Sequence, residues 1–430
     1  MQNLSRRQFL ARVAVALGAG SALLAACQEQ VLLPQPTEAI KPAASAGPAA
    51  PTASPLPGAI PLPAAAKAPA VAPDGVIVVG FNCPVTGASA RAGALQLKAM
   101  NLALRQINTS GIKGSKLSVV VQDNQSTDQG ALAALRKSIE QDNALVLLGT
   151  ATSTQVLAMS DQIKNYGVPT VIGATSASLT KQGNQWLFRA RPDDSIVAAT
   201  MVKYIKEDLK LSKVGILHED GALGTASADL VELGCRAAGL TLARREKYTT
   251  GSSDFGGQLQ AFKDAAVEIV VVFGTKPEDV AGIQRRYRQL SSPFKYIGSP
   301  ASASRDTLNL AKEAAVGLLA VTDFVPGASA ESKTYGEAYS TEYGEPLDPN
   351  SAWAYDGLKV LAEGIRMGGE DRARIREAIL GLKGYKGVQG TFNFTPNGDG
   401  LSEASVVEIP PATGSDQVPV KLLKVVNVAG

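Results

Sequence analysis

The chain has 430 residues, of which 45% are hydrophobic and 5% aromatic, so it is long enough to bury one or two ordinary cores. Its formal charge is +3, and setting aside the three arginines among the first 12 residues leaves 39 basic and 39 acidic residues. No basic block and no interleaving of basic with aromatic residues occurs, which argues against nucleic-acid binding. The three cysteines are too few for a disulfide scaffold or a metal cluster.

The N-terminal residues 1–27 have the pattern of a targeting segment. Ser5 to Leu10 resembles a twin-arginine export motif, and the uncharged run that follows is too short for a comfortable membrane span. Leu24-Ala25-Ala26-Cys27 resembles a bacterial lipobox, in which the cysteine is lipidated and becomes the mature N-terminus. The alternative is an apolar helix with a chance cysteine, but the order and spacing of two motifs favour an exported lipoprotein, anchored through Cys27 to the outer face of the cell membrane.

Residues 28–75 are rich in proline and alanine and contain eleven of the 24 prolines of the chain. Such a composition interrupts helices and favours an extended, semi-rigid linker. The functional interpretation is a disordered tether, and the alternative is inert low-complexity sequence.

From residue 76 onward, short apolar runs typical of buried strands alternate with amphipathic helical patterns. Strands are expected at 76–81, 117–121, 145–148 and 168–172, and in a second series at 213–218, 268–273, 294–297 and 316–321. Helices are expected around 97–107, 132–139, 153–166, 197–205, 224–238 and 277–290, and later at 330–343, 351–367 and 371–382. Strand-like segments follow at 391–394, 404–409 and 418–428. This order predicts an α/β protein with two Rossmann-like lobes, each with a parallel sheet covered on both faces. The late helices need a sheet to cover, and the simplest arrangement returns them to the first lobe.

The stretch from Leu145 to Thr180 is the strongest candidate for a binding site. Two expected strands end in small, hydroxyl-rich turns, 149–154 and 173–176, and a helix is expected to begin near Ser153. The N-terminus of a helix carries unpaired N–H groups and a partial positive charge, so it favours an anion such as a carboxylate. Serine and threonine also cap helices, and on this stretch alone capping is the better supported interpretation.

Several motifs, in order from residue 76 to about 400, resemble the leucine/isoleucine/valine-binding family of extracytoplasmic solute-binding proteins, which have the type I periplasmic fold. They are Pro84–Ala88, Gln106–Asn108 with Gly111–Gly114, Val121–Ser126, the turns at 149–154 and 173–176, Phe188-Arg189 with Pro192-Asp193, Asp254-Phe255, Tyr343-Gly344, Ala354–Leu358, Gly390–Phe394 and Asn397–Asp399. Each motif is weak, but their order is specific.

The resemblance implies two lobes that close on a solute in a cleft and pass it to the permease of an ABC importer. The implied lobes are 76–193 with 324–394, and 194–323 with 395–430. In family members that bind amino acids, the α-carboxylate meets loops that match Thr152, Ser153, Gly173, Ala174 and Thr175. That half of the site is intact in this sequence.

The other half departs from the family pattern. Thr275 lies where the amino-acid binders have an aromatic residue, and Pro300 where they have an acid for the α-ammonium group. A buried ammonium without a partner is costly, so either another acid serves or the ligand has no ammonium. Glu219, Asp220 and Asp323 are the candidate partners, although each also fits a solvated loop residue or a helix cap. The expected solute is a small polar or anionic molecule: a neutral or branched-chain amino acid, or a related amide or carboxylate.

No catalytic constellation is expected. The chain lacks a G-x-S-x-G motif and the glycine-rich phosphate motifs, and its single histidine, His218, is more often structural at a strand end. Cys83 and Cys235 fall in different lobes, so we expect two reduced, buried thiols. We expect no enzyme activity, no cofactor and no metal, and a monomer. A sensor of the same fold and an enzyme on an α/β scaffold are the alternatives.

Overall fold

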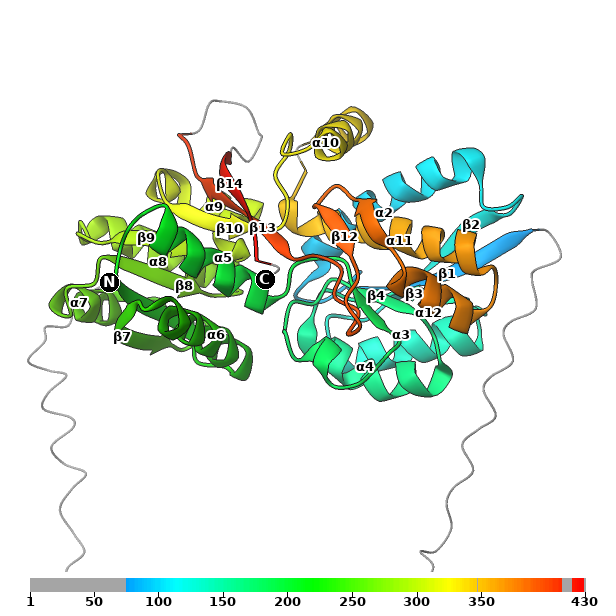
Figure 1. The fold of residues 1–430 in the computed structure, drawn as a ribbon, viewed down its shortest axis with the longest axis horizontal. Coiled ribbons are helices and arrows are strands. Elements are labelled where there is room, and N and C mark those ends of the chain that lie inside the picture. Colours follow the sequence, from blue (N-terminus) through cyan, green and yellow to red (C-terminus); the bar gives the residue numbers. More distant parts are fainter. Residues whose placement is uncertain (1–74, 346, 412–419, 429–430) are drawn as a thin grey trace, which may run out of the picture. The chain divides into compact units, whose positions relative to one another are not determined.

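Five parallel strands form the first sheet, in the order β2-β1-β3-β4-β5 (Figure 1). They are β1 (Val76–Cys83), β2 (Lys116–Asp123), β3 (Val146–Leu148), β4 (Thr170–Ile172) and β5 (Leu187–Arg189). Every residue of β3, β4 and β5 is buried, as expected for parallel strands that lie between two layers of helices. The computed structural model describes residues 75–345, 347–411 and 420–428, so the predicted signal segment with Cys27 and the predicted linker up to residue 74 lie outside it.

The second sheet has the order β14-β13-β10-β9-β8-β6-β7. Its strands are β6 (Lys213–Glu219), β7 (Thr241–Tyr248), β8 (Ile269–Phe273), β9 (Lys295–Gly298), β10 (Leu319–Thr322), β13 (Glu403–Glu408) and β14 (Lys421–Asn427). The strands from β6 to β10 are parallel, whereas β13 and β14 are antiparallel to their neighbours. The strand-like segments expected at 404–409 and 418–428 are thus present as β13 and β14, and they add an antiparallel edge to an otherwise parallel sheet.

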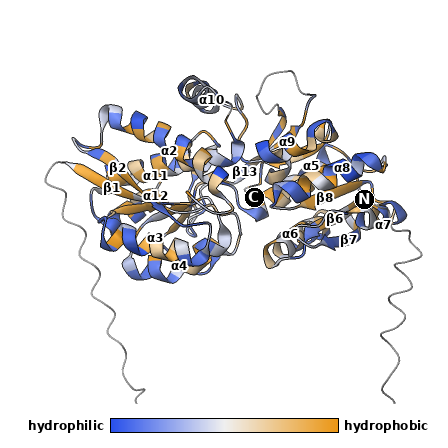
Figure 2. Ribbon diagram, turned by 180° about the vertical axis from the view of Figure 1, so that it is seen from behind, coloured by the Kyte–Doolittle hydropathy of each residue, from blue (hydrophilic) through white to orange (hydrophobic). Residues whose placement is uncertain are grey.

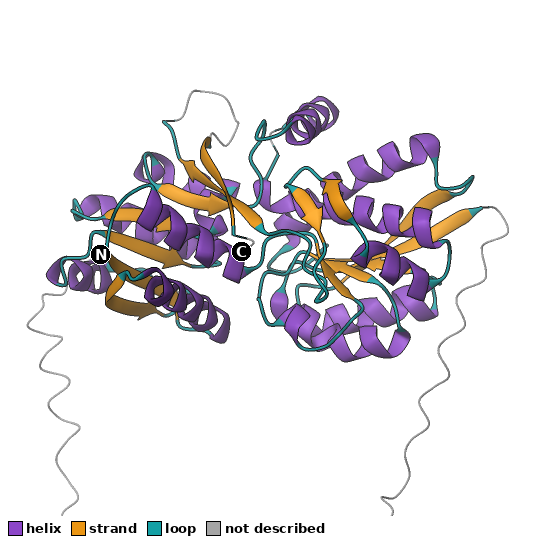
Figure 3. Cartoon of the chain, in the orientation of Figure 1, coloured by secondary structure: helices purple, strands orange, loops and turns teal. Residues whose placement is uncertain are grey.

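Helices cover both faces of each sheet (Figure 3). The helices are α2 (Ala90–Ser110), α3 (Asp128–Glu140), α4 (Ser153–Tyr166), α5 (Asp194–Glu207), α6 (Ala222–Ala238), α7 (Gly256–Asp264), α8 (Pro277–Gln289), α9 (Arg305–Ala311), α10 (Ala330–Tyr343), α11 (Ala352–Gly368) and α12 (Arg372–Leu380). Short 3-10 turns occur at Leu179–Lys181, Pro300–Ala303, Lys312–Ala315 and Pro349–Ser351, and β11 (Lys383–Lys386) pairs with β12 (Thr391–Asn393). Among the described residues, no helix is both long and apolar enough to cross a membrane.

Each lobe has a core on both faces of its sheet, and the strands are its most apolar part (Figure 2). On the first sheet, α2 and α11 pack on one face and α3 and α4 on the other. On the second sheet, α5 and α6 cover one face and α7 and α8 the other. Alternate residues of β1, from Ile77 to Cys83, point to the α11 face, because side chains alternate along a strand.

The chain passes between the two sheets three times: from β5 to α5, from β10 to α10, and from β12 to β13. Buried charges connect these crossings. Arg189 Nε lies 2.8 Å from Asp399 Oδ1, which joins the first crossing to the third. Arg191 forms an ion pair with Asp323, which joins the first crossing to the second. The helices α10 and α11 pack with α2 on the first sheet, which they complete.

The described cysteines, Cys83 and Cys235, are both buried and unpaired, in the first and the second lobe respectively. Burial raises the pKa of the Cys83 thiol to about 12 and that of Cys235 to about 11, so both stay protonated and weakly reactive at neutral pH.

Candidate functional site

The N-terminus of α4 lacks a side-chain cap. Helix α4 begins at Ser153, and the side chain of its N-cap residue, Thr152, makes no capping hydrogen bond. The hydroxyl of Thr150 instead donates to Gln155 Oε1 at 2.7 Å and accepts a longer bond from Thr152 N at 3.3 Å. The N–H groups of the first turn of α4 therefore have no side-chain cap, which is the condition for anion binding at a helix N-terminus.

Ser153 joins the two loops that the sequence singled out. Its side chain is buried, and its Oγ accepts a hydrogen bond from the backbone N–H of Ser176 at 3.2 Å. Because this bond uses a lone pair, the hydroxyl hydrogen of Ser153 is still available to donate.

The loop after β4 turns its carbonyl groups to protein partners and leaves amides unpaired. Gly173 O and Ala174 O accept from the guanidinium groups of Arg191 at 3.3 Å and Arg189 at 2.7 Å. Thr175 O accepts from Asp194 N at 2.8 Å. By contrast, the N–H groups of Ala174 and Thr175 have no acceptor among the described residues. Ala174 is fully buried, where an unpaired amide is rare, so its N–H indicates a place for an external acceptor. The N–H of Thr175, which is partly exposed, lies beside it.

Arg189 holds this loop in place. Its side chain is fully buried and, besides Asp399 and Ala174 O, its guanidinium donates to Ser176 O at 3.0 Å and Thr180 Oγ1 at 3.1 Å. From the sequence, Phe188-Arg189 is expected only as part of a crossing, so this role of Arg189 is a finding of the structure. The available signal was an arginine at the end of an apolar strand, where a charge needs partners.

Trp353, near the start of α11, packs against the same loop. The ring is fully buried and lies edge-on to Phe81, with ring centroids 6.3 Å apart. A Cβ at Gly173 would clash with the indole ring, so glycine is needed for this close approach.

Asp194 connects the first-lobe loop to the helices of the second lobe. Burial raises the pKa of its carboxyl to about 6, although hydrogen bonds from Thr175 and Ser227 act in the opposite direction. Ser227, on α6, donates to Asp194 Oδ2 at 3.2 Å. Thr175 is therefore in contact with the first turn of α5, a link that the sequence analysis did not anticipate.

In the second lobe, Glu219 and Thr275 come together. Glu219 ends β6, is 6% exposed, and accepts from Thr275 N at 3.2 Å and from Thr275 Oγ1 at 3.0 Å. The two strands β6 and β8 are adjacent and parallel, so their carboxyl ends lie at the same edge of the sheet. Since a carboxylate has about four lone pairs, Glu219 retains capacity to accept from a ligand.

Tyr248, at the end of β7, is a further residue at this edge that sequence reasoning missed. Its hydroxyl is buried without a hydrogen-bond partner among the described residues, and a Cβ at Gly274 would clash with it. Burial, followed by the charge of Glu219, raises the tyrosine pKa well above its usual value. An aromatic hydroxyl thus lies beside the loop of Thr275.

The other predicted residues of the second lobe lie elsewhere or have partners. Asp220 is exposed and accepts from Thr249 Oγ1 at 2.8 Å. Asp323 is buried in its ion pair with Arg191; burial raises its pKa, and the arginine opposes that shift. Pro300 begins the 3-10 turn that follows β9.

His218 has both ring nitrogens occupied. Nδ1 lies 2.8 Å from the carbonyl oxygen of Glu219, and Nε2 accepts from Arg245 Nε at 3.2 Å. Burial lowers its pKa, so the ring is neutral at pH 7. Among the described residues, no three His, Cys, Asp or Glu side chains are grouped to hold a metal ion.

Comparison with known proteins places this geometry in context. A family model described as "Periplasmic binding protein" matches residues 76–414. The leucine-, isoleucine-, valine-, threonine-, and alanine-binding protein of Pseudomonas aeruginosa is 26% identical over 319 residues, which is 74% of this chain and 85% of that protein.

Solved structures share the fold at lower identity. The branched-chain amino acid transporter substrate-binding protein LivJ of Streptococcus pneumoniae, in complex with isoleucine, aligns with a TM-score of 0.72 at 24% identity, over 82% of this chain and 99% of that one. A solute-binding protein of an ABC transporter from R. palustris, in complex with benzoate, aligns with a TM-score of 0.70 at 18% identity, over 82% and 96% of the two chains.

Proposed function

We propose, because the chain belongs to the periplasmic binding protein family, that it captures a small carboxylate-bearing solute outside the cytoplasm and delivers it to an ABC importer. The proteins of this family bind solutes and are not enzymes. The observation that carries the proposal is the pair of unpaired amides at Ala174 and Thr175, close to the uncapped start of α4.

The first lobe supplies the carboxylate half of this site. The ligand carboxylate accepts from the amides of Ala174 and Thr175, from the first-turn N–H groups of α4, and from the hydroxyl of Ser153. Charge-assisted hydrogen bonds contribute about 1.5–3 kcal/mol each, so two or three offset the lost hydration of one anion.

A neutral amino acid is the solute that fits the second lobe best. Glu219 is the one of the three candidate acids whose carboxylate is bonded only to Thr275, the residue at the family's aromatic position. Asp220 already accepts from Thr249, and Asp323 is already paired with Arg191, which also donates to Gly173 O. We therefore assign the ammonium group of the solute to Glu219, which Thr275 holds in place.

The second candidate is a carboxylate without an ammonium group, such as an aromatic acid. It is supported by Thr275 and Pro300, which stand where amino-acid binders have an aromatic residue and an acid, and by the benzoate bound to the R. palustris neighbour.

Calorimetric titration of the purified protein separates the two candidates. The probes are leucine, valine, 4-methylpentanoate (leucine without its amino group) and benzoate. Glu219→Gln removes one charge-assisted bond of the ammonium, so we expect the affinity for the amino acid to fall roughly tenfold or more. An unchanged affinity in Asp220→Asn then supports the assignment to Glu219. Binding of 4-methylpentanoate or benzoate alone rejects the amino acid and favours the second candidate.

Membrane anchoring is a separate part of the proposal. A lipid on Cys27 and a tether at residues 28–75 would hold the protein at the outer face of the cell membrane, next to its permease. Cell fractionation tests this directly: the wild type is expected in the membrane fraction and Cys27→Ser in the soluble extracytoplasmic fraction. A wild type found in the soluble fraction would contradict the anchor.

Transport and sensing differ in their cellular readout. If the protein serves an importer, deletion abolishes uptake of the radiolabelled solute. If it serves a receptor, deletion leaves uptake intact and removes a response to the solute.

A further inference from the structure

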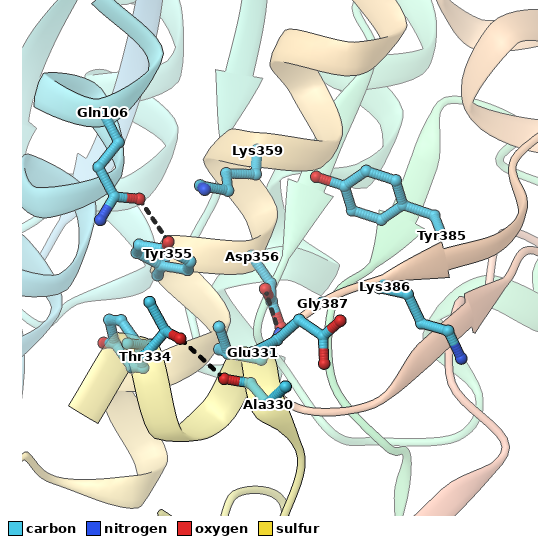
Figure 4. A pocket seen from close by; sticks show the side chains of 12 residues that line it. Gln106, Ala330, Glu331, Thr334, Tyr355, Asp356, Lys359, Tyr385, Lys386 and Gly387 are labelled. Carbon is cyan, nitrogen blue, oxygen red and sulfur yellow. Dashed lines mark hydrogen bonds between the residues drawn. The ribbon is translucent and has the colours of Figure 1, made fainter. Parts of the chain in front are cut away.

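A pocket of about 470 Å³ lies in the first lobe between α10, α11 and β11, and it contains none of the strand-end residues described above (Figure 4). Its volume lies within the range of pockets that hold small organic ligands. Its lining includes Gln106, Glu331, Tyr355, Lys359, Tyr385 and Lys386.

Lys359 brings an unpaired positive charge to this pocket. It is half-buried on α11, and its ammonium lies 4.7 Å from the ring centroid of Tyr355. It makes no ion pair with any described residue. The charge of Asp356 acts on Lys359, but the Asp356 carboxylate accepts hydrogen bonds from the backbone N–H groups of Val388 and Gln389, at 2.9 and 3.0 Å. Burial lowers the pKa of Lys359, as expected for an ammonium that lacks a direct counter-ion.

A second lysine in the same lining provides an internal comparison. Lys386 is exposed, and its ammonium donates to Thr391 Oγ1 at 2.9 Å. The two lysines carry the same charge, but Lys386 has an acceptor within the protein and Lys359 does not.

Two further polar groups of the lining lack a partner among the described residues. Tyr355 donates its hydroxyl to Gln106 Oε1 at 2.5 Å, which fixes the orientation of the carboxamide, and Gln106 Nε2 has no acceptor among the described residues. The hydroxyl of Tyr385 likewise has no described hydrogen-bond partner. In Figure 4 this hydroxyl points toward the α11 side of the pocket, where Lys359 lies.

One wall favours a flat ligand. Tyr385, on β11, contributes an aromatic ring to the lining, whereas Tyr355 is 5% exposed and its ring packs against Lys359 and against Tyr335, whose ring centroid lies 4.3 Å away. An adjoining pocket of about 160 Å³ is lined by Gln106, Lys359 and Tyr385 as well, so these three residues lie between the two hollows. A cationic ligand is disfavoured, because Lys359 itself occupies the cation–π position over Tyr355.

We propose that this pocket is an accessory binding site for a small aromatic carboxylate, distinct from the solute site at the strand ends. The carboxylate pairs with Lys359 and accepts from the Tyr385 hydroxyl, and the aromatic ring lies against the ring of Tyr385.

The test uses 4-bromobenzoate as the probe and 4-bromobenzamide as its neutral isostere. Crystals of the protein soaked with each compound are measured at the bromine absorption edge, because the anomalous peak of bromine locates the compound and separates this pocket from the strand-end site. We expect a peak in this pocket, beside Tyr385, for the acid and none there for the amide.

Matched variants then test the role of Lys359. In titrations with 4-bromobenzoate and in soaked crystals, Lys359→Met is expected to lose the peak and to bind about tenfold more weakly or worse, as the loss of one charge-assisted bond predicts. Lys386→Met is expected to keep both, and Lys359→Arg, which retains the charge, controls for damage to α11. The proposal fails if no peak appears in this pocket, if the amide binds there equally well, or if Lys386→Met has the same effect as Lys359→Met.

Discussion

Arg189 and Ser153 together explain why the first-lobe loops can present their N–H groups. Arg189 donates to the carbonyl oxygens of Ala174 and Ser176, and Ser153 Oγ accepts from the amide of Ser176. With these groups satisfied inside the protein, the amides of Ala174 and Thr175 remain for a ligand. The site thus depends on Arg189, a buried side chain that does not touch the solute, as well as on Ser153.

The first prediction concerns Ser153. Replacing it by alanine removes one hydroxyl donor to the carboxylate, so we expect the affinity for the solute to fall by roughly tenfold, equivalent to about 1.5 kcal/mol. Thr154→Ala is the matched control, because that exposed hydroxyl donates to Asp128 at 2.8 Å, away from the loop of Ala174. Calorimetric titration measures both variants. Equal affinities for Ser153→Ala and wild type would mean that the residue only joins the two loops.

Asp356 provides a prediction about pH. Burial raises its pKa to about 6, although hydrogen bonds from Val388 and Gln389 act in the opposite direction. Because the folded pKa lies above the unfolded value of about 3.9, the folded state binds more protons between these values. The contribution of Asp356 to folding stability is therefore highest below about pH 4 and declines as the pH rises through about 6.

Urea unfolding of wild type and Asp356→Asn at pH 4, 5, 6 and 7 measures this effect. The unfolding free energy of the wild type should fall relative to that of Asp356→Asn as the pH rises, by on the order of 1–3 kcal/mol across the range. A difference that is independent of pH would show that the two backbone bonds keep the pKa near its usual value.

At the scale of elements, the contact between the β4 loop and α11 sets the shape of the first-lobe site. The methyl group that Gly173→Ala adds would clash with the Trp353 ring. We therefore expect a loss of about 1–3 kcal/mol in unfolding free energy and weaker solute binding. Gly257→Ala, on α7, is the control: its Cβ would meet no neighbour, so stability should stay the same or rise slightly. Urea unfolding and solute titration measure both. A Gly173→Ala protein as stable as wild type would show that α11 shifts without cost.

Most elements were predictable because they bury a continuous apolar face. The type I periplasmic binding protein fold expected from the sequence motifs is confirmed, and the predicted strands and helices agree with the structure within a few residues. Strand β7 was missed, because half of its sequence, TLARREKY, is charged and it lies at the edge of the sheet. The short pieces β11 and α9 were also missed, since four and seven residues give too little periodicity to recognise.

For the site, the sequence indicated positions but not partners. The loops at Ser153 and Thr175 lie together because the carboxyl ends of adjacent parallel strands share one edge of a sheet. The bond between Glu219 and Thr275 spans 56 residues, and that between Arg189 and Asp399 spans 210. Such pairs depend on tertiary packing, so no local pattern marks them.

At the scale of the whole molecule, buried ion pairs connect the segments that pass between the two sheets. Arg191 and Asp323 are both buried, and each lies on a different crossing. Removing one member leaves an uncompensated buried charge, whereas removing both leaves none.

We therefore predict a non-additive cycle. Arg191→Met and Asp323→Leu should each lower the unfolding free energy by about 3–5 kcal/mol, and the double variant should lose much less than the sum. Urea unfolding of the four proteins measures the coupling. Additive losses would mean that the two charges contribute independently and that the pair does not hold the crossings together.

The return of the chain to the first lobe has a consequence for biosynthesis. When translation has reached β10, the first sheet still lacks α10 and α11, and the second sheet still lacks β13 and β14. Neither half can close its core until the last hundred or so residues emerge, so contacts distant in sequence form late and folding is slow. Truncation or cleavage near residue 323 would expose the face of the first sheet that α11 covers and the edge of the second sheet that β13 covers. We expect such fragments to be degraded by proteases or to aggregate.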